Sequence, residues 1–238
     1  MTTDVLAIVQ ARSSSSRLPG KVLEPVEGEA MVLRQLERIA RAATIDTLVV
    51  ATSVDESDDV LADLLAANGL RVRRGPLHDV FSRFSSVVEE FEPSVIVRLT
   101  ADCPLTDPAV IDAVVTSHLR SGADYSSNVL ERTFPHGLDV ECVSAPAFAA
   151  ASAMNLSAQD REHVTLAIYS HPELFRLNSV TQSVDRSALR WTVDYPEDLA
   201  FVRSVYSALY AGNPAFDQQD IVDYLQAHPA LNRTGETL

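Results

Sequence analysis

Short runs of branched apolar residues alternate along the chain with longer segments whose apolar positions repeat at helical spacing. A continuous apolar run, typical of a strand buried on both faces of a parallel sheet, occurs at 5–9, and mostly apolar runs at 47–51 and 95–99 predict two more strands, with a shorter candidate at 71–73. The intervening pattern predicts helices over 31–43, 55–68, 80–91 and 108–121. Regular alternation of this kind predicts a doubly wound α/β sheet.

The second half of the chain is less regular. We predict short strands at 124–127 and 138–143, a late strand at 189–193, and helices over 157–169, 197–210 and 218–227. No internal repeat and no linker-like boundary interrupts the sequence, so we expect a single domain over 1–238. Within it, residues 124–190 are interpreted as an excursion that carries acceptor contacts or a dimer interface.

Charge narrows the classes of function. The 238 residues carry a formal net charge of −14, which disfavours a nucleic-acid groove and an anionic membrane surface. Lys21 is the only lysine, and it lies near Arg12 and Arg17. Two cysteines make no disulfide framework, and no leader-like or membrane-length apolar stretch is present, so we expect a cytoplasmic protein.

In open sheets of this kind, ligands bind beyond the carboxyl ends of the strands, so the polar residues that follow each strand matter most. The first such segment is Gln10-Ala-Arg-Ser-Ser-Ser-Ser-Arg-Leu-Pro-Gly-Lys21. Its small residues can turn backbone N–H groups toward an anion, and its three cations suit a triphosphate. The segment is not a Walker A loop, because Val22 follows Lys21. The plainer alternative is a flexible polar loop with surface ion pairs.

Two aspartates follow predicted strands at separate places in the chain. Asp102 comes after the strand at 95–99, and Asp194 comes after the strand at 189–193. Mg²⁺ binds a few protein oxygens together with substrate phosphates, so a shared metal site is one interpretation. The alternative is that each aspartate caps a turn or a helix.

Several motifs in the same order give the sequence a family resemblance. The opening loop resembles the Q-A-R-x-x-S-x-R-L-P-G-K-V-L signature of the cytidylyltransferase family. The resemblance continues through 75–84, 98–105, 135–141, 161–165 and 192–199. That family includes the SpsF-like proteins of spore-coat polysaccharide biosynthesis, and it is related to the CMP-Kdo and CMP-sialic acid synthetases.

The resemblance implies a three-layer α/β/α, Rossmann-like fold of the GT-A nucleotidyltransferase type, with a predominantly parallel mixed sheet. It implies catalytic roles for Arg12, Lys21 and Asp102 and Mg²⁺ on Asp102 and Asp194. The nucleotide site that it implies consists of Ala11, Arg12, Ser13, Arg17, Lys21, Ser53, Gly75, Asp79, Thr100 and Ala101. One departure concerns the loop, because Ser13-Ser14 stand where relatives commonly have Met-Gly, and glycine relieves crowding in a tight turn.

The acceptor would be held by the later motifs. In a strand over 138–143, Asp139 and Glu141 would point to the same face and could orient sugar hydroxyls. Arg161 could clamp a carboxylate or phosphate, while Glu162 and His163 are either site residues or ordinary residues of a first helical turn. His136 stands where relatives often have an acidic residue, and a surface histidine is the alternative.

The resemblance therefore predicts transfer of CMP from CTP to a small acidic sugar or similar anionic acceptor, with release of pyrophosphate. A phosphate, phosphonate or polyol acceptor, or another NTP, remains an alternative, as does a homodimer. Two other classes are a glycosyltransferase, which would commonly carry a D-x-D motif where Asp102 stands, and a non-catalytic nucleotide-binding protein, which would be expected to lose a metal aspartate or the loop cation.

Overall fold

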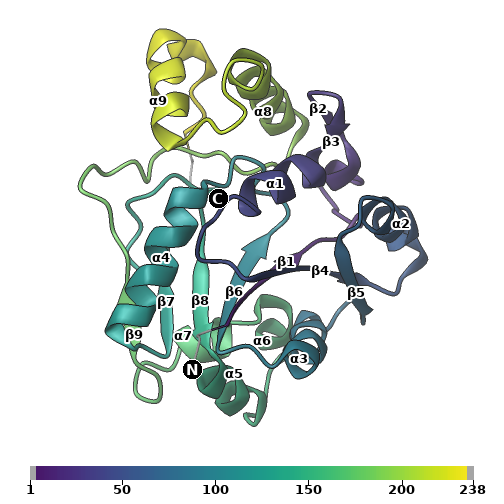
Figure 1. The fold of residues 1–238 in the computed structure, drawn as a ribbon, viewed down its shortest axis with the longest axis vertical. Helices are drawn as coiled ribbons and strands as arrows, with labels where there is room; N and C mark the ends of the chain where they lie inside the picture. Colours follow the sequence, from purple (N-terminus) through teal and green to yellow (C-terminus); the bar gives the residue numbers. More distant parts are fainter. Residues whose placement is uncertain (1–3, 235–238) are drawn as a thin grey trace.

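A computed structural model describes residues 4–234, which build one seven-stranded mixed sheet (Figure 1). The strand order is β5-β4-β1-β6-β8-β7-β9. The strands are β1 (Val5–Gln10), β4 (Thr47–Ser53), β5 (Arg71–Gly75), β6 (Val95–Thr100), β7 (Tyr125–Ser127), β8 (Glu141–Ser144) and β9 (Leu177–Ser179). Strands β5, β4, β1 and β6 run parallel, β8 is antiparallel to both of its neighbours, and β9 is parallel to β7.

Helices cover both faces of the sheet, because the central strands are apolar on both sides. Along β1, Val5, Ala7 and Val9 enter one core, while Leu6 and Ile8 enter the other. The first core is closed by α1 (Met31–Ile39), α2 (Asp59–Ala67), α4 (Pro108–Ser121), α8 (Pro196–Leu209) and α9 (Gln218–Ala227). The second is closed by α3 (Val80–Phe91), α5 (Ala145–Ser152) and α7 (Leu166–Tyr169), with α6 (Ala158–His163) against α3. The predicted three-layer α/β/α fold with a mainly parallel sheet is confirmed.

The parallel strands end together at one edge of the sheet. Gln10 at the end of β1 pairs with Thr100 at the end of β6, and Ser53 at the end of β4 pairs with Gly75 at the end of β5. The loops that leave these strands therefore begin side by side. They are the segments that carry the predicted nucleotide site.

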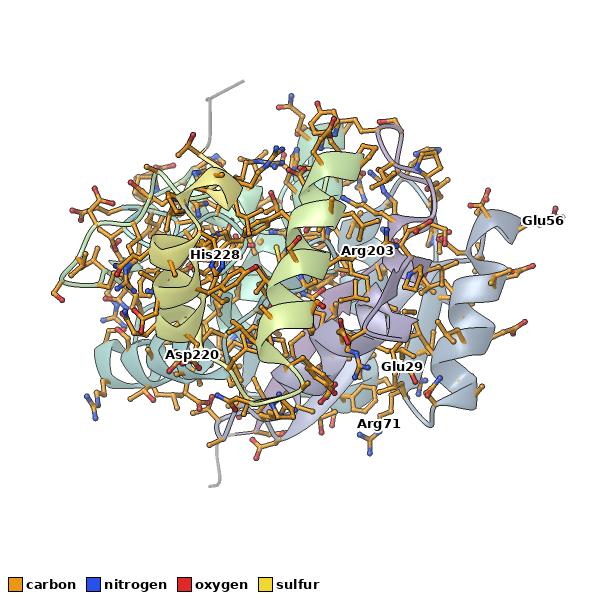
Figure 2. All side chains as sticks on the ribbon, turned by 90° about the horizontal axis from the view of Figure 1, so that it is seen from above. Glu29, Glu56, Arg71, Arg203, Asp220 and His228 are labelled. Carbon is orange, nitrogen blue, oxygen red and sulfur yellow. The ribbon has the colours of Figure 1, made fainter. Side chains whose placement is uncertain are left out.

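A small hairpin holds the far end of the first loop. A 3₁₀ turn over Lys21–Leu23 leads into β2 (Pro25–Val26) and β3 (Glu29–Ala30). Figure 2 shows α8, which carries Arg203, beside α9, which carries Asp220 and is followed directly by His228. Arg203 donates to the carbonyl of Pro25 at 2.8 Å and forms an ion pair with Glu24 at 2.8 Å. The late helix α8 thus fixes the segment that follows Lys21.

Four predicted elements differ in the structure. The expected strand at 189–193 is wrong: only isolated bridges form there, because Leu189, Arg190 and Trp191 bond to three different segments rather than to one neighbouring strand. The strand expected from 138 starts only at Glu141, and the helix expected over 31–43 ends at Ile39. The helix expected over 157–169 is broken at Val164, whose φ of 53° is incompatible with continuing α6.

The strands β2, β3 and β9 and the helix α5 had no counterpart in the sequence prediction. Segment 124–190 contains the strands β7, β8 and β9, which belong to the main sheet. It also contains the helices α5, α6 and α7. Within residues 4–234, no helix has the length and apolarity needed to cross a bilayer.

Candidate active site

A polar cleft of about 200 Å³ opens at the carboxyl ends of β1 and β6. The cleft is lined by Gln10, Arg12, Ser15, Ser16, Arg17, Lys21, Val22, Thr100, Ala101, Asp102 and Asp194. These residues come from three separate parts of the chain, and the polar segments after β1 and β6 are the ones that the sequence singled out. Cations from the first loop therefore face carboxylates from the second and third segments across one cleft.

Lys21 joins the three segments. Its side chain is only 9% exposed, and its ammonium donates to the carbonyl of Val193 at 2.5 Å and to Asp194 Oδ1 at 3.2 Å. The same nitrogen lies 3.6 Å from Asp102 Oδ2. The only lysine of the chain thus neutralises both aspartates, which lie 92 positions apart in sequence.

Asp102 is held in its ionised form. Burial alone would raise the pKa of this carboxyl, but the Lys21 ammonium, followed by hydrogen bonds from Thr100 and Cys103, lowers the pKa below its ordinary value. Thr100 Oγ1 donates to Asp102 Oδ1 at 2.6 Å, and Cys103 Sγ donates at 3.4 Å. Burial, followed by the charge of Asp102, raises the pKa of Cys103 well above its usual range, so this thiol is a neutral donor.

Asp194 accepts from three cations. Oδ1 receives Arg17 Nη2 at 2.7 Å in addition to Lys21, and Oδ2 receives Arg190 Nη2 at 2.6 Å. Asp198 caps the start of α8 by accepting from the backbone N–H groups of Asp194 and Tyr195 at 2.9 and 3.0 Å. The capping role considered for Asp194 therefore belongs to Asp198, and Asp194 faces the cleft.

The first loop is folded back on itself by backbone hydrogen bonds. The carbonyl of Ser13 accepts from the N–H groups of Ser15 and Gly20 at 2.9 and 2.8 Å, and Gly20 has a φ of 73°. The N–H of Ser13 donates to Asp58 Oδ1 at 2.6 Å. Positive φ within 11–20 is confined to Gly20, so serine at 13 and 14 meets no left-handed backbone requirement there.

Asp58 is a buried carboxylate that the sequence prediction missed. It binds the first loop through Ser13 and binds β4 through the N–H and hydroxyl of Ser53. Ser53 is fully buried, so its side chain is committed to Asp58 rather than to the cleft. The sequence signal was weak, because Asp58 lies in an acidic stretch that reads as an ordinary first turn of a helix.

The remaining predicted nucleotide residues are placed around the same edge. The backbone N–H groups of Ala11 and Ala101 donate hydrogen bonds to the carbonyls of Ala51 and Gln10. These two residues can therefore contact a nucleotide by packing but have no free N–H donor for it. Asp79 caps α3 by accepting from Ser82 N at 2.8 Å and also binds Arg161 at 2.8 Å. Gly75 ends β5 and lies against the side chain of Arg83.

A second cavity of about 490 Å³ adjoins the cleft. Thr100 lines both spaces. The second cavity is lined by Arg98, Thr100, Tyr125, Val129, Leu130, Arg132, Asp139, Glu141 and Tyr169. Thr100 also binds Asp102, so the two cavities meet beside that carboxylate.

Both carboxylates of this second cavity are paired with arginines. Glu141 forms an ion pair with Arg98 and accepts from Tyr125 OH at 2.6 Å and Thr165 Oγ1 at 2.7 Å. Asp139 receives both ends of the Arg132 fork at 2.6 and 2.9 Å. These bonds fix the orientation of the two side chains that a ligand in the cavity would meet.

The six predicted acceptor residues are not brought together. Asp139 and Glu141 line the second cavity, whereas Arg161 and Glu162 lie on α6 and bind Asp79 and Arg12 at 2.8 and 3.1 Å. His163 is exposed at the end of α6. His136 bonds through its backbone to Leu189 and Trp191; its burial, followed by the nearby Arg132, lowers the pKa of its side chain.

The donor set suits a hard divalent cation that arrives with a nucleotide. Within residues 4–234, no group of three or more His, Cys, Asp or Glu side chains is placed to hold an ion. The two cleft aspartates can supply two oxygens, and Mg²⁺ or Mn²⁺ completes its coordination with phosphate oxygens and water. The residues present fit a metal that is shared with a substrate rather than one held by the protein alone.

Comparisons with known proteins agree with this architecture. The family model described as cytidylyltransferase matches residues 6–222. The spore coat polysaccharide biosynthesis protein SpsF of Bacillus subtilis (strain 168) is 35% identical over 95% of both chains.

Two solved structures resemble the fold of this chain. The structure of a cytidylyltransferase from Leptospira borgpetersenii serovar Hardjo-bovis superposes with a TM-score of 0.92 and 27% identity, covering 100% of this chain and 99% of that one. A CMP:2-keto-3-deoxy-manno-octonic acid synthetase complexed with CTP shares the fold, with a TM-score of 0.65, 16% identity and coverage of 87% and 99%. The chain therefore belongs to the cytidylyltransferase family and is a nucleotidyltransferase.

Proposed function

We propose that this enzyme transfers CMP from CTP to a hydroxyl group of a small acidic sugar, in a Mg²⁺-dependent reaction that releases pyrophosphate. The observation that carries the proposal is the position of Lys21, whose ammonium lies within 3.6 Å of both Asp102 and Asp194 in a cleft rimmed by Arg12 and Arg17. The CTP complex of the CMP:2-keto-3-deoxy-manno-octonic acid synthetase supports CTP as the donor.

The cations of the first loop can stabilise the negative charge of pyrophosphate, the leaving group of the proposed reaction. In the reaction, an acceptor oxygen forms a bond to the α-phosphorus while the bond from that phosphorus to the bridging oxygen of pyrophosphate breaks. Negative charge builds on pyrophosphate, and Arg12, Arg17 and Lys21 stabilise it from one side of the cleft. Asp58 holds the loop and Asp194 binds Arg17 and Lys21, so these two charges are positioned before the substrate arrives, whereas Arg12 is paired with Glu162.

Asp102 and Asp194 would hold the metal together with phosphate oxygens. Bound there, Mg²⁺ supplies a Lewis acid that polarises the α-phosphate. The lowered pKa of Asp102 keeps this carboxylate ionised at neutral pH, which suits a ligand for a cation and does not suit a general acid.

The acceptor would occupy the second cavity and reach the α-phosphate past Thr100. Seven of its nine lining residues lie within 124–190, which supports the substrate-binding role expected for that segment. Asp139 and Glu141 can accept hydrogen bonds from sugar hydroxyls, and the Arg132 side chain, 21% exposed, can turn to a carboxylate. Arg98 and Arg132 are already paired with Glu141 and Asp139. Because neither arginine is unpaired, a neutral polyol is the second candidate acceptor.

A pyrophosphate-release screen tests the proposal. Each of the four NTPs is combined with acidic sugars, sugar phosphates, phosphonates and polyols, with and without Mg²⁺. We expect release only with CTP, Mg²⁺ and one class of acceptor. Binding of CTP without pyrophosphate release from any acceptor would instead favour a non-catalytic nucleotide-binding protein.

Matched variants locate the activity in the cleft. Asp102→Asn keeps the size of the side chain and removes the charge, so we expect activity to fall by about 100-fold or more, in line with the loss of one electrostatic group. Asp63→Asn makes the same change on the exposed face of α2 and should leave activity unchanged. Equal activity in both variants would contradict the assignment of the metal site.

A further inference from the structure

Arg83 is a buried cation without a partner. It lies on α3 and is 3% exposed, and its Nε and Nη1 atoms have no hydrogen-bond partner among the described residues. No carboxylate of residues 4–234 forms an ion pair with it. Leaving charged N–H groups buried and unbonded is costly, so a side chain in this state is a candidate for binding a ligand.

The surroundings of Arg83 point to a ligand. Arg83 lines a small cavity of about 30 Å³ beside the nucleotide cleft, together with Gln10, Ala11, Arg12, Val80 and Glu162. Gln10 and Arg12 also line the cleft, so the two spaces are neighbours. The ion pair between Arg12 and Glu162, whose side chains are 41% and 35% exposed, lines the small cavity and lies nearer to solvent than Arg83.

Gly75 makes room for this arginine. A Cβ atom at position 75 would lie 2.7 Å from Cγ of Arg83, closer than carbon atoms approach without displacement. The glycine lies at the end of β5, at the same sheet edge as the cleft. Its missing side chain therefore allows Arg83 to reach this edge from α3.

The charges around Arg83 act on it in opposite directions without bonding to it. Burial, followed by the nearby charge of Arg12, lowers the pKa of Arg83, while the carboxylates of Asp58, Glu162 and Asp79 act in the opposite direction. None of these carboxylates is within ion-pair distance, so its N–H groups stay available for neutral acceptor atoms.

Resting on the proposed use of CTP, we propose that Arg83 is the residue that selects cytosine, by donating to O2 and N3 of the base. Cytosine presents acceptors at both atoms. Uracil presents an N–H donor at N3, which would face the donors of the guanidinium, and a purine is larger than a pyrimidine at the same position. A ring does not fit in 30 Å³, so the Arg12–Glu162 pair separates when the base binds, which frees Arg12 for the phosphates.

Nucleotide affinities of one variant test the inference. Arg83→Met keeps the length of the side chain and removes its donors. We expect the wild-type protein to bind CTP in the presence of Mg²⁺ more tightly than UTP, and the variant to lower that ratio by about 10- to 100-fold, the discrimination expected of one bidentate contact to a base. Arg71→Met changes an exposed arginine at the start of β5 (Figure 2) and should keep the wild-type ratio.

Two further measurements separate recognition from a structural role. Unfolding of the nucleotide-free Arg83→Met variant should occur at the wild-type temperature or above it, because an unpaired buried charge has been removed. Gly75→Ala keeps Arg83 but displaces it, so this variant should also lose the preference for CTP.

The outcomes are distinct. A wild-type protein that binds no nucleotide overturns the proposed function. A wild-type preference for CTP that survives both Arg83→Met and Gly75→Ala overturns the role of Arg83 and leaves the proposed function standing. A wild-type protein that binds CTP and UTP equally also overturns the role of Arg83.

Discussion

The ammonium of Lys21 is nearly buried and is shared between two carboxylates and a backbone carbonyl. This placement fixes its position before any substrate binds, and preorganised charge of this kind is the usual source of electrostatic catalysis. In Lys21→Met we expect turnover to fall by about 100- to 1,000-fold. Steady-state pyrophosphate release measures the effect, and Arg71→Met, which removes an exposed cation at the start of β5, is the comparison for a lost cation. Equal losses in the two variants would contradict a special role for Lys21.

Asp58 acts through the residues that it holds. It accepts hydrogen bonds at both of its oxygens, from Ser13 on one side and Ser53 on the other. Asparagine would turn an NH₂ group toward one of these donors, so we expect Asp58→Asn to destabilise the fold by about 1–3 kcal/mol. Because the first loop loses its anchor, KM for CTP should rise more than kcat falls.

The neighbouring aspartate is the matched control. Asp59→Asn changes an exposed side chain that pairs with Arg74 at 2.6 Å, and surface pairs contribute about 0–1 kcal/mol. Urea unfolding and steady-state kinetics of both variants make the comparison. A loss of stability in Asp59→Asn as large as that in Asp58→Asn would show that the buried bridge has no particular importance.

Among the elements, α3 ends at a residue whose strained backbone can be relieved by substitution. Glu92 at its C-terminus has a φ of 45° and a ψ of 48°, the left-handed conformation that costs most residues about 1–2 kcal/mol. Its side chain is exposed and forms none of the observed hydrogen bonds. Glu92→Gly should therefore stabilise the protein by about 1 kcal/mol. Glu92→Ala keeps a Cβ and should give no gain, and thermal unfolding of the pair distinguishes strain relief from the removal of a charge.

At the level of elements, local patterns predicted what local interactions decide. The strand at 95–100 is mostly apolar, and α4 begins at Pro108 after the capping residue Asp107, so both were predictable from adjacent residues. The segment 189–193 alternates apolar residues with polar ones but is not a strand, since its backbone bonds to three separate segments. Its conformation depends on distant residues that no local pattern reveals.

Some residues of the candidate site could also be predicted from local patterns, and others could not. Lys21, Asp102 and Asp194 could be chosen from the sequence because each lies in a polar segment after a predicted strand, within a motif of the family. Arg83 and Asp58 could not be chosen, because an arginine or an aspartate on a helix is normally exposed, and only the packed fold shows that both are buried. The placement of α6 beside α3 likewise took Arg161 and Glu162 away from Asp139 and Glu141.

At the scale of the whole molecule, two histidines with lowered pKa values make the free energy of unfolding depend on pH. His118 on α4 is buried beside the hydroxyl of Ser126, and burial lowers its pKa, with a small opposing effect of Asp124. Burial and the charge of Arg132 also lower the pKa of His136. Below the unfolded pKa of about 6.5, the unfolded chain binds protons that the folded protein does not. The free energy of unfolding should therefore be full above that pH and should fall as the pH drops below it.

Urea unfolding at pH 7.5 and pH 5.5 measures this dependence. In His118→Gln, which keeps a polar group for Ser126, the difference between the two pH values should become smaller. An unchanged difference would show that the buried imidazole does not contribute to the acid sensitivity of the fold.

For the whole molecule, three distant segments must meet to bind one substrate, and calorimetric titration of CTP with and without MgCl₂ measures this. We expect Mg²⁺ to tighten CTP binding at least about tenfold in the wild-type protein, and we expect Asp102→Asn to abolish this gain whereas Asp63→Asn keeps it. CTP binding that is absent, or that is the same with and without Mg²⁺, would show that the three segments do not form a shared site for the metal and the nucleotide.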